Sequence, residues 1–289
     1  MSLDIGAAFR EGGSRTVAKS GLLLVAAFIV FGVVTLVLTQ TLAVGVAEAT
    51  LEFIQSVDPA EAGLSQAEYE RSVSDLQTMV SDAQELYPLA IDLSPGIAAA
   101  GLVAVALLWE TASIIAVRVF AANDPESLTS GDVSGNLLLA TLNGFIGKIV
   151  VWGLMLLGFV VFVFPGIFFA VAFYFLRQEI ALRDKNFVSG MADSWRLTKG
   201  HRIEVFAVAL VVVVLSQLDV VLSPLGSVVP QTAVAVLGTG ISAAIAVFGA
   251  AVVTRLYVQL REEAEAEAEA AEAEKDPYDA ALGPDDIPE

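Results

Sequence analysis

The chain has 289 residues, of which 56% are hydrophobic, and its formal net charge at pH 7 is −18. It is more apolar than soluble domains, in which roughly 45–50% of residues are apolar. It contains no cysteine and one histidine, which excludes disulfides, thiolate metal sites and multi-histidine metal sites; we expect no cofactor. The acidic balance excludes nucleic acid as a partner, because phosphate recognition needs clustered Lys and Arg.

The negative charge is concentrated in two polar segments. Residues 48–92 hold ten acidic side chains and one basic, and residues 262–289 hold twelve acidic and one basic. In molar salt the Debye length is about 3 Å, so dense like charges repel one another weakly. Together with five lysines against ten arginines and no cysteine, this pattern predicts a halophilic source. Two acidic loops on a protein from ordinary salt are the alternative.

Long uncharged runs predict an all-α integral membrane protein. Residues 149–176 and 220–254 are runs of 28 and 35 residues without a charged side chain. A helix needs about 20 apolar residues to cross a bilayer core, and it satisfies its own backbone hydrogen bonds there. We therefore predict a membrane domain over residues 1–261, a bundle of about six transmembrane helices. The predicted spans are residues 20–47, 96–121, 144–164, 167–182, 203–222 and 232–258.

The N-terminal segment precedes the first apolar run. Residues 1–19 carry three basic side chains, and Ile5 and Phe9 lie one helical turn apart, which predicts a short interfacial helix. Residues 20–47 contain 28 residues without a charge. A signal peptide has an apolar core of about 7–15 residues, so we expect this run to remain as a span.

Residues 48–94 form a predicted external acidic helical insertion. Apolar side chains recur there at spacings of four and three residues, which indicates one stripe on a helix from about Ser65 to Leu86. Such a helix either packs on other helices of the same chain or forms a coiled coil with a second chain. The stripe consists of Tyr69, Val73, Leu76, Val80, Ala83 and Tyr87.

The third and fourth segments are short for full spans, and Pro165 and Gly166 lie between them. Proline lacks a backbone donor and ends a helix, so this pair predicts a helix break and a sharp turn. The two segments are then either two separate spans or a re-entrant hairpin with its tip at Pro165-Gly166.

An amphipathic segment follows the fourth span. Phe187, Met191 and Trp195 lie four residues apart, on one face of a helix. We expect an interfacial anchor in which Trp195 lies at head-group depth and the basic side chains face anionic lipid. An anchor without lipid specificity is the simpler reading. The basic anchors are Arg196, Lys199 and Arg202.

The stretch Ser194-Trp195-Arg196-Leu197-Thr198-Lys199-Gly200, with Pro165-Gly166 ahead of it, resembles a known pattern. It is similar to uncharacterised six-helix membrane proteins related to the membrane domain fused to some bacterial glycerophosphodiester phosphodiesterases, in a haloarchaeal-type sequence. The resemblance implies a membrane module. The phosphodiesterase domain of the fused proteins has no counterpart here, and the acidic insertion departs from the compact loops expected of the group.

The last segment spaces Gly238, Ser242, Ala246 and Ala250 four residues apart, which favours close helix packing, in the core or in a dimer. Residues 262–289 alternate Glu and Ala and then turn to Asp and Pro. This composition predicts an acidic, low-complexity cytoplasmic tail, either a helical extension of the last span or disordered.

The basic residues predict the orientation. In the six-span scheme fourteen of them lie on one side and Arg71 alone on the other. We therefore predict a multi-pass protein of the cell (plasma) membrane with both termini in the cytoplasm. The fourteen are Arg10, Arg15, Lys19, Arg118, Lys148, Arg177, Arg183, Lys185, Arg196, Lys199, Arg202, Arg255, Arg261 and Lys275.

Glu110 is the one acidic residue that we place deep inside a predicted span. Lys148, Arg118 and Arg177 are long enough to reach the inner surface, but Glu110 is not. Glu110 therefore forms a structural ion pair with Lys148 or Arg177, or is protonated in place, or takes part in transport.

Catalytic signatures such as a Walker loop, G-x-S-x-G or H-E-x-x-H do not occur in the sequence. The favoured prediction is a non-catalytic membrane protein that acts in envelope organisation or as a partner subunit. A transporter or channel-like permease using Glu110 is the alternative, and an enzyme ranks third. The expected partners are the lipid bilayer and either other membrane proteins or a second copy of the chain.

Overall fold

A computed structural model of the chain describes residues 3–122, 130–218 and 229–273. All regular structure in these ranges is helical, which confirms the all-α prediction. Five helical segments in this part of the chain are long and apolar enough to cross a membrane, where we predicted about six spans. They are residues 19–56, 95–121, 137–161, 163–183 and 232–271. The predicted fifth span, residues 203–222, contains only α10 (Arg202–Ser216), and its residues 219–222 lie outside the described ranges.

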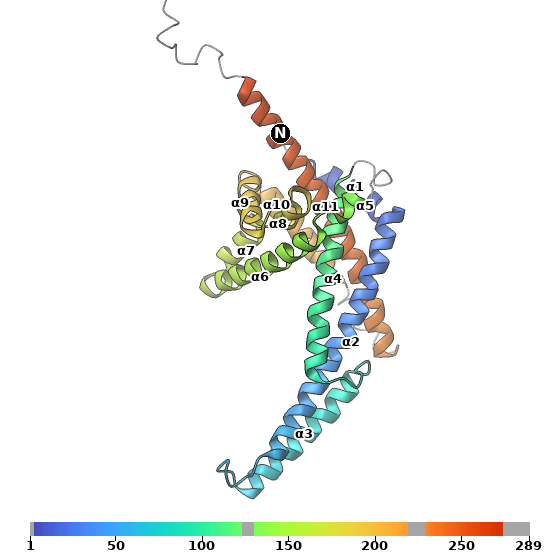
Figure 1. Cartoon of the computed structure of the whole chain (residues 1–289), viewed down its shortest axis with the longest axis vertical. Coiled ribbons are helices and arrows are strands. Elements are labelled where there is room, and N and C mark those ends of the chain that lie inside the picture. Colours follow the sequence, from blue (N-terminus) through green and yellow to red (C-terminus); the bar gives the residue numbers. More distant parts are fainter. Residues whose placement is uncertain (1–2, 123–129, 219–228, 274–289) are drawn as a thin grey trace, which may run out of the picture.

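Three long helices, α2 (Lys19–Ser56), α4 (Pro95–Ala121) and α11 (Gln231–Ala273), run along the long axis of the molecule (Figure 1). They approach closely because small residues lie between them: a Cβ atom on Gly32 of α2 would lie 2.5 Å from the Thr239 side chain of α11. Larger side chains fill the rest of their contact. The shared core consists of Leu24, Phe28, Ala112, Ala116, Phe120, Ala243, Val247 and Ala251.

The acidic insertion is a helical hairpin. Helix α2 continues nine residues beyond the predicted end of the first span, and α3 (Gln66–Leu86) folds back along it, away from the other helices (Figure 1). The predicted helix from Ser65 to Leu86 is thus confirmed. Ser65 and Glu68 form a reciprocal capping box, in which the Glu68 amide donates to the Ser65 hydroxyl at 3.3 Å and the Ser65 amide to the Glu68 carboxylate at 2.9 Å.

The apolar stripe of α3 faces α2 of the same chain. All six stripe residues are half-buried, whereas the remaining residues of α3 are exposed. Two side chains of α2 also hold the segment that follows α3: Gln40 accepts a hydrogen bond from the Leu89 amide at 2.9 Å, and Thr41 accepts one from the Ile91 amide at 3.0 Å. Packing within the chain therefore accounts for the stripe.

The N-terminal helix α1 (Ile5–Val17) packs against α11. Asp4 caps it by accepting a hydrogen bond from the Ala7 amide at 2.7 Å. Gly12 is needed at the contact, because a Cβ atom there would lie 2.9 Å from the Val252 backbone nitrogen. We expected an interfacial helix here, and its apolar face is occupied by α11.

Helices α6 (Leu137–Val161) and α7 (Val163–Ala172) form a hairpin that projects to one side of the long helices (Figure 1). Its break lies at Phe162, three residues before the predicted break at Pro165-Gly166. Pro165 instead occupies the first turn of α7, where its missing N–H has no intrahelical partner to lose. Gly166 lies against α6, since a Cβ atom on Gly158 would be 2.6 Å from the Gly166 nitrogen.

A turn at residues 173–175 interrupts the predicted fourth span between α7 and α8 (Leu176–Arg183). The short α9 (Phe187–Leu197) packs on α8, with Phe187 and Met191 half-buried against the Leu176 and Ile180 core. Helix α5 (Ser130–Ser134) precedes α6. Helix α11 covers the predicted sixth span and continues into residues 262–273, while residues 274–289 of the predicted tail lie outside the described ranges.

Candidate functional site

Glu110 and Arg177 form a two-point ion pair between α4 and α8. The Arg177 Nε atom donates to Oε1 of Glu110 at 2.9 Å, and Nη2 donates to Oε2 at 3.0 Å. Glu110 is only 1% exposed and lies in the middle of an apolar helix. Parallel hydrogen bonds between a guanidinium and a carboxylate are the strongest geometry for such a pair. Both carboxylate oxygens are therefore satisfied without water.

Helix α6 closes the site from its second side. A Cβ atom on Gly144 would lie 2.7 Å from Oε1 of Glu110, so only glycine lets α6 cross at this level. One turn earlier, the hydroxyls of Thr111 and Thr141 lie 3.1 Å apart and join α4 to α6. The role of Gly144 could not be predicted from the sequence, because a single glycine in an apolar run carries no local signal of such a crossing.

Lys148 lies one turn beyond Gly144 but does not join the pair. Among the described residues, no hydrogen bond or ion pair engages its amine. It lines a cavity of about 190 Å³ together with Glu110 and Arg177, and it also lines a larger groove. Of the two basic residues that we considered as partners of Glu110, the structure places Arg177 on the carboxylate and leaves Lys148 beside it.

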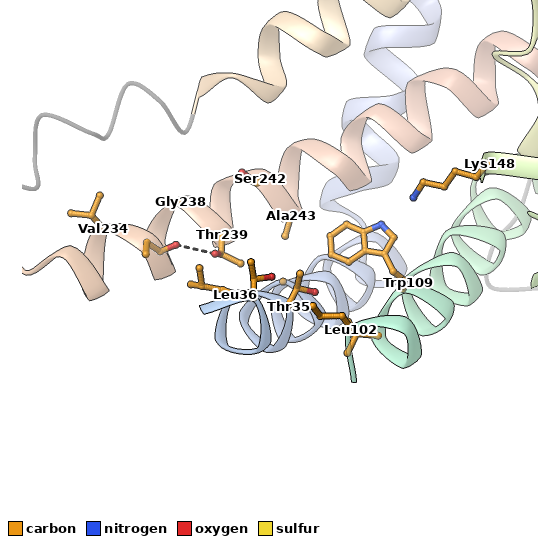
Figure 2. Close-up of a pocket in the computed structure, with 15 residues that line it drawn as sticks. Thr35, Leu36, Leu102, Trp109, Lys148, Val234, Gly238, Thr239, Ser242 and Ala243 are labelled. Atoms are coloured by element: carbon orange, nitrogen blue, oxygen red, sulfur yellow. Dashed lines mark hydrogen bonds between the residues drawn. The ribbon is translucent and has the colours of Figure 1, made fainter. Parts of the chain in front are cut away.

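The larger groove, of about 740 Å³, lies between α2, α4 and α11. In Figure 2 the Lys148 amine extends from α6 toward Trp109 at one end, and Val234 lies at the other. Gly238 and Ser242, from the predicted small-residue stripe, line this groove, whereas Ala246 and Ala250 pack on the three-helix core. Two residues of the small-residue stripe therefore line the groove, and the other two pack against the core.

We expected Arg118 to extend outward from the end of α4 to the inner surface, but in the structure its side chain turns inward. It is 8% exposed, and its guanidinium donates to three backbone carbonyls: Ala181 at 2.9 Å, Val133 at 2.8 Å and Gly135 at 2.6 Å. These carbonyls belong to the segment before α6 and to α8. Arg118 therefore holds both the start and the end of the segment from α6 to α8 at the C-terminal end of α4.

A second buried carboxylate, Glu179, went unrecognised in the sequence. It is fully buried in α8, two residues after Arg177, and it accepts a hydrogen bond from Arg261 of α11. Arg261 also donates to the Tyr257 hydroxyl at 3.2 Å. Residues two apart point to opposite sides of a helix, so α8 uses one charged residue toward α4 and another toward α11. The burial of Glu179 could not be predicted, because this residue lies near the end of the predicted span.

The motif from Ser194 to Gly200 supports the turn between α7 and α8. The Ser194 hydroxyl accepts from the Phe175 amide at 3.2 Å and donates to the Ala172 carbonyl at 3.0 Å. Thr198 donates to the same carbonyl at 3.4 Å, and both side chains are fully buried. The broken helix leaves these backbone groups without helical partners, and the two hydroxyls supply them. Gly200 follows with φ +99°, a left-handed conformation suited to glycine.

Three of the four predicted interfacial anchors make contacts within the protein. Trp195 is 37% exposed and packs edge-to-face on Phe168 at 5.1 Å, and the Arg202 guanidinium lies 4.5 Å from the Phe168 ring centre and 4.9 Å from that of Trp195. Arg196 pairs with Asp193, and Lys199 is exposed. Their position relative to lipid head groups stays a prediction.

Asp193 is the centre of a small charged cluster on α9. It hydrogen-bonds Arg196 and lies 3.5 Å from the Lys185 amine. The hydrogen bond from Arg196 lowers the pKa of Asp193 below its ordinary value, although partial desolvation opposes the shift. Within the described ranges, no group of three His, Cys, Asp or Glu side chains is placed to hold a metal ion.

Within residues 3–122, 130–218 and 229–273 the protein is all-helical, with five helical segments long and apolar enough to cross a membrane and with buried charges paired between helices. A family model for a domain of unknown function, DUF7847, matches residues 3–260, and the chain belongs to this family. No curated protein and no solved structure matches the chain.

Proposed function

We propose that the chain is a non-catalytic polytopic protein of the cell membrane that organises the envelope or serves as a partner subunit. The observation that carries this proposal is the two-point Glu110–Arg177 pair. Both oxygens of the carboxylate accept from one guanidinium, and a Cβ atom on Gly144 would lie 2.7 Å from Oε1, so α6 packs against one side of the pair while a cavity of about 190 Å³ adjoins it. A carboxylate that carries a proton or an ion must change partners during transport, whereas this one joins α4 to α8 as a fixed cross-link.

Glu110 lies eleven residues from the end of α4 at Ala121, which corresponds to roughly 16 Å at about 1.5 Å per residue. In a bilayer core of roughly 30 Å this is near the middle. A lone carboxylate there is costly, and the ion pair removes that cost. The resemblance of residues 194–200 to a pattern in six-helix membrane modules supports the same proposal.

The proposed orientation places both termini in the cytoplasm and the α2–α3 hairpin outside. Arg118, Arg15 and α9 lie at one end of the long helices, and the Arg15 side chain donates to the Ala122 carbonyl at 2.5 Å. The hairpin with Arg71 lies at the other end (Figure 1). Single cysteines at Ser72 and Ala268, treated with an impermeant thiol reagent on intact cells, test this. The Ser72 site should react and the Ala268 site should be protected; the reverse pattern would overturn the orientation.

We further propose that α6 and α7 form a re-entrant hairpin. Helix α6 crosses α4 at the level of Glu110 instead of running alongside it (Figure 1), and Arg118 holds both ends of the α6–α8 segment. The apolar tip is well exposed, with Val160 at 84% and Phe164 at 73%, as suits insertion among lipid tails. A cysteine at Phe162 should stay unreactive from both sides of the membrane. Labelling from outside would instead show two full spans.

A permease is the second candidate, favoured by Lys148, whose amine forms no ion pair with a described residue and lies beside the groove. The proton or ion flux of the wild type and of Glu110→Gln in proteoliposomes separates the two functions. A scaffold shows no flux in either protein and loses stability with the substitution. A permease shows wild-type flux that disappears in the variant while its stability is kept.

A further inference from the structure

The charges around Glu110 do not balance. Two cations, Arg177 and Lys148, share one carboxylate, and Arg177 takes both of its oxygens. In the described part of the chain the Lys148 amine has no hydrogen-bonding partner, although it extends toward Trp109 at the end of the α2–α4–α11 groove (Figure 2). Lys148 is exposed on α6, within the predicted third span, and a cation exposed to lipid is stabilised by an opposite charge. The groove therefore offers one positive end to whatever occupies it.

The remainder of the groove is lined mainly by apolar side chains such as Leu36, Leu102 and Val234. The Thr35 hydroxyl donates to the Phe31 carbonyl at 2.8 Å and the Thr239 hydroxyl to the Ala235 carbonyl at 2.9 Å, so both donors are used within their own helices. The Thr39 and Ser242 hydroxyls also line the groove, but Lys148 is its one basic side chain. A volume of about 740 Å³ is within the range of ligand sites, about 300–1,000 Å³.

We propose that this groove binds a single-chain anionic lipid from the surrounding membrane. Its apolar chain lies between α2, α4 and α11, and its charged end pairs with Lys148. The shape of the site matches this chemistry, since one cation stands at the end of a long apolar surface. Such a site would serve a scaffold and a permease alike. Because its test does not involve Glu110, failure of the lipid site would leave the proposed scaffold function intact.

Trp109 lines the groove and reports its occupancy, because bromine atoms quench indole fluorescence on contact. The full chain is purified in detergent with Trp152→Phe and Trp195→Phe, which leaves Trp109 as its one tryptophan. It is titrated with 9,10-dibromostearate and, separately, with the matched dibromostearyl alcohol. The two probes share a chain and differ in the charge of the head group. We expect the carboxylate to quench Trp109 at a concentration at least about five-fold lower than the alcohol, as one basic residue contributes.

Variants of the same background locate the effect. Lys148→Gln should remove the preference for the carboxylate, Lys148→Arg should keep it, and Lys199→Gln, at an exposed lysine outside the groove, should not change it. Ala106→Phe, on the groove wall, should weaken quenching by both probes. Equal quenching by the two probes, or a preference that survives Lys148→Gln, would overturn the proposal. Melting curves of each variant show that loss of quenching is not loss of fold.

Discussion

The α2–α3 hairpin and the α4–α6–α8 crossing use the same acidic side chain in opposite ways. On α3, Glu70 is exposed and accepts one hydrogen bond, from the neighbouring Gln66 side chain at 3.0 Å. In the crossing, Glu110 is 1% exposed and bound at both oxygens by Arg177 of a distant segment. Water solvates the first carboxylate, whereas the second has only its protein partner.

Burial, not residue type, therefore decides how much an acidic residue contributes to the stability of the fold. An exposed charge interacts through water and is screened by salt. Removing one member of a buried pair instead leaves an uncompensated charge in a low dielectric. The hairpin should therefore tolerate substitution at its glutamates, and the crossing should not.

The largest expected effect is at Glu110. Glu110→Gln leaves Arg177 without its counter-charge and should lower the free energy of unfolding by about 3–5 kcal/mol. The matched change Glu70→Gln should cost less than about 0.5 kcal/mol. Denaturation in mixed micelles measures both. Adding Arg177→Met to Glu110→Gln should restore part of the loss, and equal effects at the two glutamates would contradict the comparison.

Gly144 and Gly153 of α6 give the next test. A Cβ atom on Gly144 would lie 2.7 Å from the Glu110 carboxylate, but one on Gly153 would meet no atom within 4 Å. Gly144→Ala should therefore destabilise the protein by about 1–3 kcal/mol through overpacking. Gly153→Ala should be neutral or stabilise by up to about 1 kcal/mol through helix propensity. Similar melting temperatures for the two variants would show that α6 does not cross at Gly144.

Ser194 should contribute less than Glu110, because it is neutral. Ser194→Ala removes the partner of the Phe175 amide in the turn after α7. Leaving such a buried donor unsatisfied costs about 1–3 kcal/mol. Ser72→Ala on the exposed hairpin, where the hydroxyl binds only its own helix, is the control. Unfolding free energies that match within about 0.5 kcal/mol would remove the proposed role of the motif.

The smallest effect is expected at the capping box of α3. The hydrogen bonds from Ser65 lower the pKa of Glu68. A carboxyl whose pKa is lower in the folded state stabilises it above its unfolded pKa, about 4.3. This contribution is then lost as the pH falls through the folded pKa. The hairpin should thus lose helix signal in circular dichroism below about pH 4, and Ser65→Ala should reduce this dependence. An identical acid profile for wild type and variant would contradict the assignment.

The salt concentration tests the same contrast between the exposed charges of the hairpin and the buried charges of the crossing. The acidic hairpin should gain helix as salt rises from about 0.1 M to molar concentration, because the Debye length falls from about 10 Å to 3 Å. Circular dichroism follows this gain. It would support the predicted halophilic source, and the Glu110 pair, shielded from water, should not respond.

Local pattern predicted much of this fold. The bounds of α3 followed from the spacing of six apolar residues, and the start of α2 from an uncharged run that ends nine residues before the helix does. The predicted second span, residues 96–121, matches α4 to within one residue. The helix break after α6 was placed three residues too late. A proline marks the neighbourhood of a break, but it is equally accommodated in the first turn of the next helix. The stripe and the uncharged run are local features of the chain, and no distant contact was needed to recognise them.

Partners across the bundle depended on tertiary structure. The sequence by itself determined the helical class, the long apolar helices and the presence of a deep carboxylate with two basic candidates nearby, because helix period and apolar length are local properties. Only the three-dimensional arrangement decided that Arg177 rather than Lys148 holds Glu110, that Glu179 is buried against Arg261, and that Arg118 turns inward to backbone carbonyls. Those choices depend on where α4, α6, α8 and α11 cross, and the crossing angles arise from packing between residues far apart in the chain.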